Sequence, residues 1–193
     1  MSHRFAMPSS ANAPRSRGRL QRERTALVVV DVQEGFRPVI DGFGGLARQA
    51  AILVQGAQVL GLPVLVTEQY PKGLGPTVPE VAEHLDGTAP VAKTVFSAPE
   101  ADGFDLQGRD QVVICGIESH ICVMQSALAL LDDGVEVEVA ADAVSSRALA
   151  NRAIGPERMR EGGAGITSVE TALFELLGRA GTDEFKQVQR IIK

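Results

Sequence analysis

The chain has 193 residues, of which 45% are hydrophobic and 22% are charged, and its formal net charge is −5. This composition is typical of one globular domain and excludes wholesale disorder. No apolar run approaches the ~18 residues that cross a bilayer, which excludes a membrane span. Two cysteines cannot form a secreted disulfide framework, and no apolar signal segment precedes the first apolar run. We therefore expect a reducing, cytoplasmic environment.

The charge is unevenly distributed along the chain. Residues 1–24 contain six arginines and one acidic residue, which gives this segment a net charge of +5, whereas the remainder carries 13 basic and 23 acidic residues. The segment 1–24 has no hydrophobic periodicity and is predicted to be a disordered basic tail; a mitochondrial transit peptide is the alternative. The acidic remainder argues against a nucleic-acid partner, because binding to phosphates needs a basic face.

After the tail, apolar runs alternate with amphipathic segments. Runs that fit buried strands lie at 25–31, 63–67, 111–116 and 135–140, with a short strand expected before Lys93; helical periodicity occurs at 46–60, at 119–131, from 167 onward and at 183–193. Strands buried on both faces are typical of a parallel sheet covered by helices. The alternation predicts a single doubly wound, Rossmann-like, three-layer α/β domain over 25–193, with a mainly parallel sheet of about six strands.

Ligands of such sheets bind beyond the carboxyl ends of the strands, so the first candidate is Asp31, which ends the first strand. Its loop has one glycine, Gly35, and lacks the G-x-G-x-x-G pattern of dinucleotide-binding domains, and no phosphate-binding loop occurs elsewhere. An oxidoreductase that uses NAD or FAD is therefore excluded, and we expect no cofactor. A helix cap or a loop anchor is the alternative role for Asp31.

The second candidate is Cys122, in the stretch Cys115-Gly-Ile-Glu-Ser-His-Ile-Cys122 after the fourth strand. If Ser119 is the N-cap of the following helix, Cys122 lies in its first turn, where free backbone N–H groups and the helix dipole favour a thiolate. The alternative is a small buried side chain, which is the usual role of a free cysteine and the role expected for Cys115.

Lys93, His120 and possible metal ligands are the remaining candidates. Lys93 is flanked by apolar residues, which indicates a partly buried ammonium in need of a carboxylate, although a solvated surface charge is the alternative. His120 is near Cys122 in the chain, but residues two apart on a helix do not face each other, so we interpret it as a rim or interface residue. The three histidines and the loop Thr67-Glu-Gln-Tyr-Pro71 offer no ligand spacing for a metal site.

Taken together, Asp31, Lys93 and Cys122 resemble the Asp-Lys-Cys triad of the isochorismatase-like cysteine hydrolases. The resemblance covers about 25–193 and is strongest to the isochorismatase domain-containing branch, through Val66-Thr-Glu-Gln-Tyr-Pro-Lys-Gly-Leu-Gly-Pro-Thr-Val-Pro79, Cys115-Gly-Ile-Glu118 and the Phe185–Lys193 segment. It implies hydrolysis of a small amide-like or ureide-like substrate through a covalent thioester, and a homo-oligomer.

The resemblance also implies further site features. These are a cis peptide between Ile117 and Glu118, an oxyanion hole made by the backbone N–H groups of Glu118 and Cys122, and a pocket whose candidate residues are Gln33, Phe36, Tyr70 and Ser119. For each pocket candidate, packing within a loop is the alternative. Glu68-Gln-Tyr70 replaces the Asp and His that hold a metal in related nicotinamidases, so no metal is expected. True isochorismatases lack the nucleophilic cysteine, which makes isochorismate an improbable substrate.

A second function class stays open, because a fold does not prove an activity. The chain could be a catalytically idle or regulatory oligomeric binding protein, with the apolar face from Phe185 to Ile192 as an assembly element. Packing of that face within the same chain is the alternative.

Overall fold

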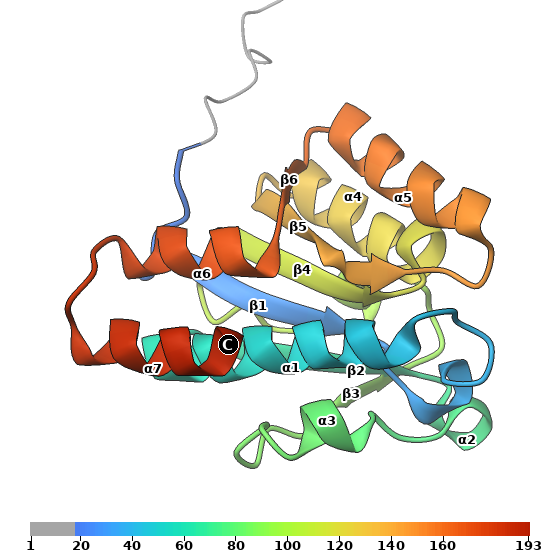
Figure 1. Cartoon of the computed structure of the whole chain (residues 1–193). Helices are drawn as coiled ribbons and strands as arrows, with labels where there is room; N and C mark the ends of the chain where they lie inside the picture. Colours follow the sequence, from blue (N-terminus) through green and yellow to red (C-terminus); the bar gives the residue numbers. More distant parts are fainter. Residues whose placement is uncertain (1–17) are drawn as a thin grey trace, which may run out of the picture.

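The computed structural model describes residues 18–193, which form a six-stranded parallel sheet covered on both faces by helices (Figure 1). The strands are β1 (Thr25–Val30), β2 (Val64–Gln69), β3 (Val91–Lys93), β4 (Gln111–Ile117), β5 (Glu136–Ser145) and β6 (Gly165–Thr167). Their order is β3-β2-β1-β4-β5-β6, and every neighbouring pair is parallel. This confirms the predicted fold class.

Two helical layers flank the sheet (Figure 1). One contains α1 (Phe43–Leu60), α6 (Val169–Leu177) and α7 (Asp183–Ile192), and the other contains α4 (Met124–Asp132) and α5 (Leu149–Glu161). Short helices lie in the loops: η1 (Glu34–Phe36), α2 (Pro71–Leu74), α3 (Pro79–Ala82), η2 (Ala98–Glu100) and the π-helical turn η3 (Ser119–Val123).

The core follows the two-residue periodicity of the strands. In β1, Leu27 and Val29 face the layer of α1, whereas Val28 and Val30 face the layer of α4. Because all six β1 side chains are buried, the strand reads as one continuous apolar run rather than an alternating one. The two cysteines belong to different layers, Cys115 to the first and Cys122 to the second.

The order of the strands reverses between β1 and β4, since the chain runs from β1 outward to β3 and then from β4 outward to β6. The two central strands approach closely there: a Cβ at Gly116, whose φ is +121°, would lie 2.0 Å from the carbonyl oxygen of Val30. The loops after β1 and β4 diverge from this point. The crevice where such sheets bind ligands is therefore expected between Asp31 and the η3 turn.

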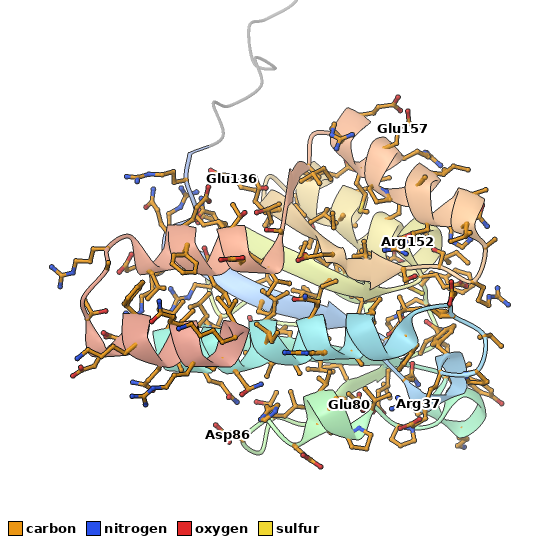
Figure 2. All side chains as sticks on the ribbon, in the orientation of Figure 1. Arg37, Glu80, Asp86, Glu136, Arg152 and Glu157 are labelled. Atoms are coloured by element: carbon orange, nitrogen blue, oxygen red, sulfur yellow. The ribbon has the colours of Figure 1, made fainter. Side chains whose placement is uncertain are left out.

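The loop after β2 is fastened to the loop after β1. Arg37 pairs with Glu34 at 2.8 Å and with Glu80, at the start of α3, at 2.9 Å. Figure 2 shows Arg37 and Glu80 together below α1. Gln33 and Thr77 add an antiparallel bridge between the same two loops. These contacts fix residues 70–82 beside the carboxyl end of β1.

One expectation about the chain ends needs correction, and one alternative is decided. Residues 1–17 lie outside the described residues, but the last part of the expected tail packs on the domain: Leu20 is buried, and Arg24 pairs with Asp110 and Glu136. The apolar face of α7 is packed on the domain, with Val188 fully buried in the same core as α1. The alternative of packing within the chain is therefore the right one for that face.

Candidate active site

Asp31 lies at the carboxyl end of β1 with φ +54°, a left-handed conformation that is uncommon outside glycine and that turns the chain out of the strand. Its side chain is fully buried. Oδ1 accepts a hydrogen bond from Thr67 Oγ1 at 2.7 Å, and Oδ2 accepts one from Lys93 Nζ at 2.8 Å. Both carboxylate oxygens are therefore held by neighbouring strand ends, which fixes the orientation of the carboxylate.

Lys93 is the last residue of β3, and its side chain is also fully buried. Besides Asp31, its ammonium donates to Gln69 Oε1 at 2.7 Å and to the carbonyl oxygens of Phe96 and Val95 at 3.2 and 3.3 Å. An ammonium has three N–H groups, and these four acceptors use all of them. Lys93 can therefore hold Asp31 and place positive charge in the site, but it has no N–H left for a substrate.

Cys122 lies in the π-helical turn η3, and only 6% of the residue is exposed. Its Sγ is 3.9 Å from Gln69 Oε1. The charges of Asp31 and Lys93 act on the thiol, and they change its pKa in opposite directions. The three residues of the expected triad, which come from three separate strand ends, are thus brought into one cluster. Thr67 and Gln69 complete this cluster.

The ionisation of Cys122 differs from the expectation. Burial, reinforced by the negative charge of Asp31, raises the pKa of the Cys122 thiol to about 12, and Lys93 offsets this only in part. This direction is opposite to that of the expected thiolate, because burial disfavours the charged form of the thiol. At neutral pH the Cys122 thiol is therefore protonated, and it would need a base in order to act as a nucleophile.

Gln69 is a member of this cluster that the sequence analysis did not name as a candidate. It is the last residue of β2 and pairs in register with Lys93, the last residue of β3. Gln69 lies in the stretch Val66–Pro79 that carries the family resemblance, but nothing in that stretch assigned a role to its side chain. The signal was its position after a buried apolar strand, at the same level as Asp31 and Lys93.

The peptide bond between Ile117 and Glu118 is cis, at the junction of β4 and η3. The Glu118 side chain is directed to Arg147, whose Nε lies 3.1 Å from both carboxylate oxygens and whose backbone N–H donates to one of them at 2.9 Å. Glu118 therefore joins η3 to the loop after β5 through its side chain, while its backbone opens the turn that carries Cys122.

Ser119 does not have the capping role that we expected. η3 has no side-chain cap, and the buried Ser119 Oγ lies 2.7 Å from Ser146 Oγ. Ser146 Oγ is in turn 2.9 Å from His120 Nδ1, and His120 Nε2 is 3.1 Å from Asn151 Nδ2. This chain of hydrogen bonds ties η3 to the loop after β5 and to α5. Ser119 is thus a support of the turn, and His120 lies at its partly exposed rim.

The other pocket candidates divide into two kinds. Gln33 is fully buried and bonded to backbone groups of Gln69 and Gly75, so it anchors a loop. Phe36 packs against the core. Tyr70, in contrast, is 55% exposed directly after β2, and Phe96, which the sequence analysis passed over, is 52% exposed after β3. Aromatic surface therefore flanks the outer edge of the cluster.

The loop after β2 does not gather metal ligands. Glu68 accepts hydrogen bonds from the backbone N–H and the Oγ1 of Thr77, at 2.6 and 2.8 Å, so its carboxylate is part of the loop structure. Among residues 18–193, no group of three or more His, Cys, Asp or Glu side chains is arranged to hold a metal ion.

Comparison with known proteins decides the family. The family model described as "Isochorismatase domain" matches residues 25–171, which span β1 to the first residues of α6. The chain belongs to the isochorismatase family. Membership of this family, together with the α/β fold, places the protein among the isochorismatase-like hydrolases.

Relatives in this family include vertebrate proteins of similar length. Isochorismatase domain-containing protein 2A of Mus musculus is 42% identical over 186 residues, which cover 95% of this chain and 89% of the mouse protein. The secreted isochorismatase effector Isc1 of Phytophthora sojae is 40% identical over 195 residues, which cover 97% and 93% of the two chains.

Solved structures of other proteins agree with the fold. The MAR1 ribonuclease of Caenorhabditis elegans superposes with a TM-score of 0.85 at 37% identity, covering 91% of this chain and 92% of the other. The YcaC gene product of Escherichia coli, described as an octameric hydrolase of unknown specificity, has a TM-score of 0.83 at 23% identity and covers 92% and 91% of the two chains. No helix within residues 18–193 has both the length and the apolar character to cross a membrane.

Proposed function

We propose that this member of the isochorismatase family is a cysteine hydrolase that cleaves a small amide-like or ureide-like substrate through a thioester intermediate. The observation that carries the proposal is the buried contact of 2.8 Å between Asp31 and Lys93 beside the thiol of Cys122. A carboxylate, a cation and a thiol in one partly water-excluded cluster supply a base, its counter-charge and a nucleophile.

The first half of the reaction forms the thioester. Sγ of Cys122 attacks the substrate carbonyl carbon while the thiol proton passes to the carboxylate of Asp31, and the carbonyl π electrons move to the oxygen. The intermediate then collapses, the C–N bond breaks, and Asp31 returns the proton to the departing amine. The raised pKa of the Cys122 thiol fits this order, because the proton leaves only as the bond to carbon forms.

The second half releases the acid. Asp31 takes a proton from water, the hydroxide oxygen attacks the thioester carbon, and the C–S bond breaks, with the proton returning to sulfur. Negative charge develops on the substrate oxygen in both halves, and we assign the backbone N–H groups of Glu118 and Cys122 to it. One such donor contributes on the order of 2.7–4 kcal/mol to lowering the barrier.

The proposal concerns a carbonyl compound rather than RNA, although one relative is named a ribonuclease. Sulfur attack followed by a thioester requires an electrophilic carbonyl carbon, and the chain after residue 24 has an excess of acidic residues. Metal-dependent nicotinamide hydrolysis receives no support, since Glu68 is bound within its loop.

We further propose that the enzyme acts as a homo-oligomer in the cytoplasm. The octamer described for the YcaC gene product supports assembly of this fold. Two cysteines that are free and buried are compatible with a reducing compartment. The idle binding protein remains the competing function, but the packed face of α7 no longer supports it.

The test is to trap the intermediate. The protein is incubated with a panel of small amides, ureides and activated esters, quenched in acid and analysed by intact mass and peptide mapping. We expect an acyl adduct on Cys122, turnover in the wild type, and none in Cys122→Ala. Cys115→Ala is the matched control and should keep its activity. Turnover by Cys122→Ala, or hydrolysis of RNA but of no carbonyl compound, contradicts the proposal.

A further inference from the structure

Gln69 is held by hydrogen bonds at both its backbone and its side-chain polar groups. Its backbone N–H donates to Gln33 Oε1 at 2.8 Å, and its carbonyl oxygen accepts from Gln33 Nε2 at 3.1 Å. Its side-chain Nε2 donates to the carbonyl oxygen of Thr94 at 2.9 Å. Because Nε2 is bonded to Thr94, the amide oxygen Oε1 lies on the other side of the side-chain amide group. That side faces Lys93 and Cys122.

Gln69 Oε1 lies between the ammonium and the sulfur. It is 2.7 Å from Lys93 Nζ, shorter than the 2.8 Å between Lys93 and Asp31, and 3.9 Å from Cys122 Sγ. The first contact is a strong charge-assisted hydrogen bond, and the second is within the reach of a weak S–H···O contact. The same oxygen thus takes an N–H that would otherwise be available to a thiolate, and it accepts a weak hydrogen bond from the thiol.

We propose that Gln69 is a positioning residue that holds the Lys93 ammonium away from the Cys122 sulfur and so keeps the nucleophile protonated until Asp31 removes its proton. This inference rests on the proposed function of Cys122 as the nucleophile. It adds a reason for the residue type: a neutral acceptor satisfies Lys93 without adding negative charge beside Asp31. A carboxylate at the same place would add that charge next to the thiol.

The charges that act on the sulfur are few. Asp31 and Lys93 are the charged groups that influence its titration, in opposite directions. On the turn itself, Glu118 is paired with Arg147, and His120 is bonded to Ser146 and Asn151. Arg152 on α5, which packs against the turn, is exposed. A change at Gln69 therefore acts on Cys122 through Lys93 and Asp31.

The experiment measures the ionisation of Cys122 without a substrate. The full-length protein is alkylated with iodoacetamide below pH 9, where the fold is retained, and the rate at Cys122, read by peptide mapping, reports the fraction of thiolate. We expect Gln69→Ala to lower the pKa of Cys122 by about one unit or more, because the freed ammonium pairs with the thiolate. Gln69→Glu should raise it further.

The change in the fraction of thiolate sets the size of the expected differences in alkylation rate. At one pH, Gln69→Ala should react about tenfold faster than the wild type, and Gln69→Glu should react more slowly, since one pKa unit corresponds to a tenfold change in thiolate. Gln55→Ala, which removes a glutamine bonded only within α1, is the control and should match the wild type.

The two Gln69 variants are expected to change the alkylation rate in opposite directions, and this distinguishes positioning from structural damage. Damage that loosens the site would expose the sulfur and speed alkylation in both variants. Alkylation rates that coincide with the wild type, or that change the same way in both variants, overturn the proposal. If the expected changes occur but no carbonyl substrate is ever found, the role of Gln69 stands and only the hydrolase proposal fails.

Discussion

Lys93 Nζ lies 2.8 Å from Asp31 Oδ2, and neither side chain is exposed to solvent. An ion pair at this depth is costly to desolvate and is a weak source of stability by itself, whereas removal of one partner leaves an uncompensated buried charge. The pair is therefore expected to serve the chemistry of Cys122 more than the fold. Its removal nevertheless has a large structural cost.

The first prediction concerns this pair. Lys93→Met should lose activity and about 3–5 kcal/mol of stability, because it leaves Asp31 buried and unpaired. The double variant Asp31→Asn, Lys93→Met should regain much of the stability but none of the activity. Urea unfolding and a turnover assay measure the two effects. Lys186→Met, which breaks an exposed pair with Asp183, should change the stability by less than about 1 kcal/mol.

The second prediction concerns access to the two thiols. In the native protein iodoacetamide should label Cys122 and leave Cys115 unlabelled, because Cys115 is fully buried and Cys122 is 6% exposed. The rate at Cys122 should rise about tenfold per pH unit above neutrality, since the thiolate is the reacting form and its pKa is raised to about 12. Peptide mapping measures the labelling of each cysteine. In denaturant, where neither thiol is buried, Cys115 and Cys122 should be labelled at similar rates. Equal labelling of the folded protein contradicts the placement of Cys122 in an accessible site.

The third prediction is a loss of stability at alkaline pH. Burial raises the pKa of both Cys115 and Cys122 to about 12, from 9.0 in the unfolded chain. Between these values the unfolded chain releases thiol protons that the folded protein retains. The free energy of unfolding should therefore be fully present below pH 9 and fall as pH rises above it, by up to about 1.4 kcal/mol per unit for each thiol. Urea unfolding at several pH values measures the slope, and Cys122→Ala should reduce it; an unchanged slope contradicts the prediction.

The fourth prediction concerns the contact by which α5 supports η3, the turn that carries Cys122. A Cβ at Gly155 would lie 2.4 Å from the backbone oxygen of Ser119, so the helix can approach η3 only with glycine there. Gly155→Ala should cost about 1–3 kcal/mol of stability through overpacking. It should also lower kcat by displacing the turn that carries Cys122. The comparison is thermal unfolding together with turnover.

The matched control for this change is Gly44→Ala on α1, where an added Cβ meets nothing within 4 Å. It should be neutral or slightly stabilising, because alanine has the higher helix propensity. If both alanine variants behave alike, the close contact of α5 with η3 is not what holds the turn.

Much of the fold could be predicted because it is recorded in local patterns. Continuous apolar runs such as Thr25–Val30 indicate strands buried on both faces, and their alternation with amphipathic segments predicts a parallel sheet. Since parallel strands end at one edge, Asp31 and Lys93 could be placed at the same edge before their contact was known. The end of the N-terminal segment was predicted less well, because whether Leu20 is covered depends on distant partners.

The sequence by itself determined the alternation of strands and helices, the family and the residue types at the strand ends. Only the tertiary structure decided that Gln69 Oε1 lies between an ammonium and a sulfur, that Ser119 supports the turn instead of capping it, and that the Cys122 thiol is protonated at neutral pH. The physical reason is that register between strands and depth of burial are set by contacts between segments far apart in the chain. Local periodicity contains no information about the desolvation that raises a pKa.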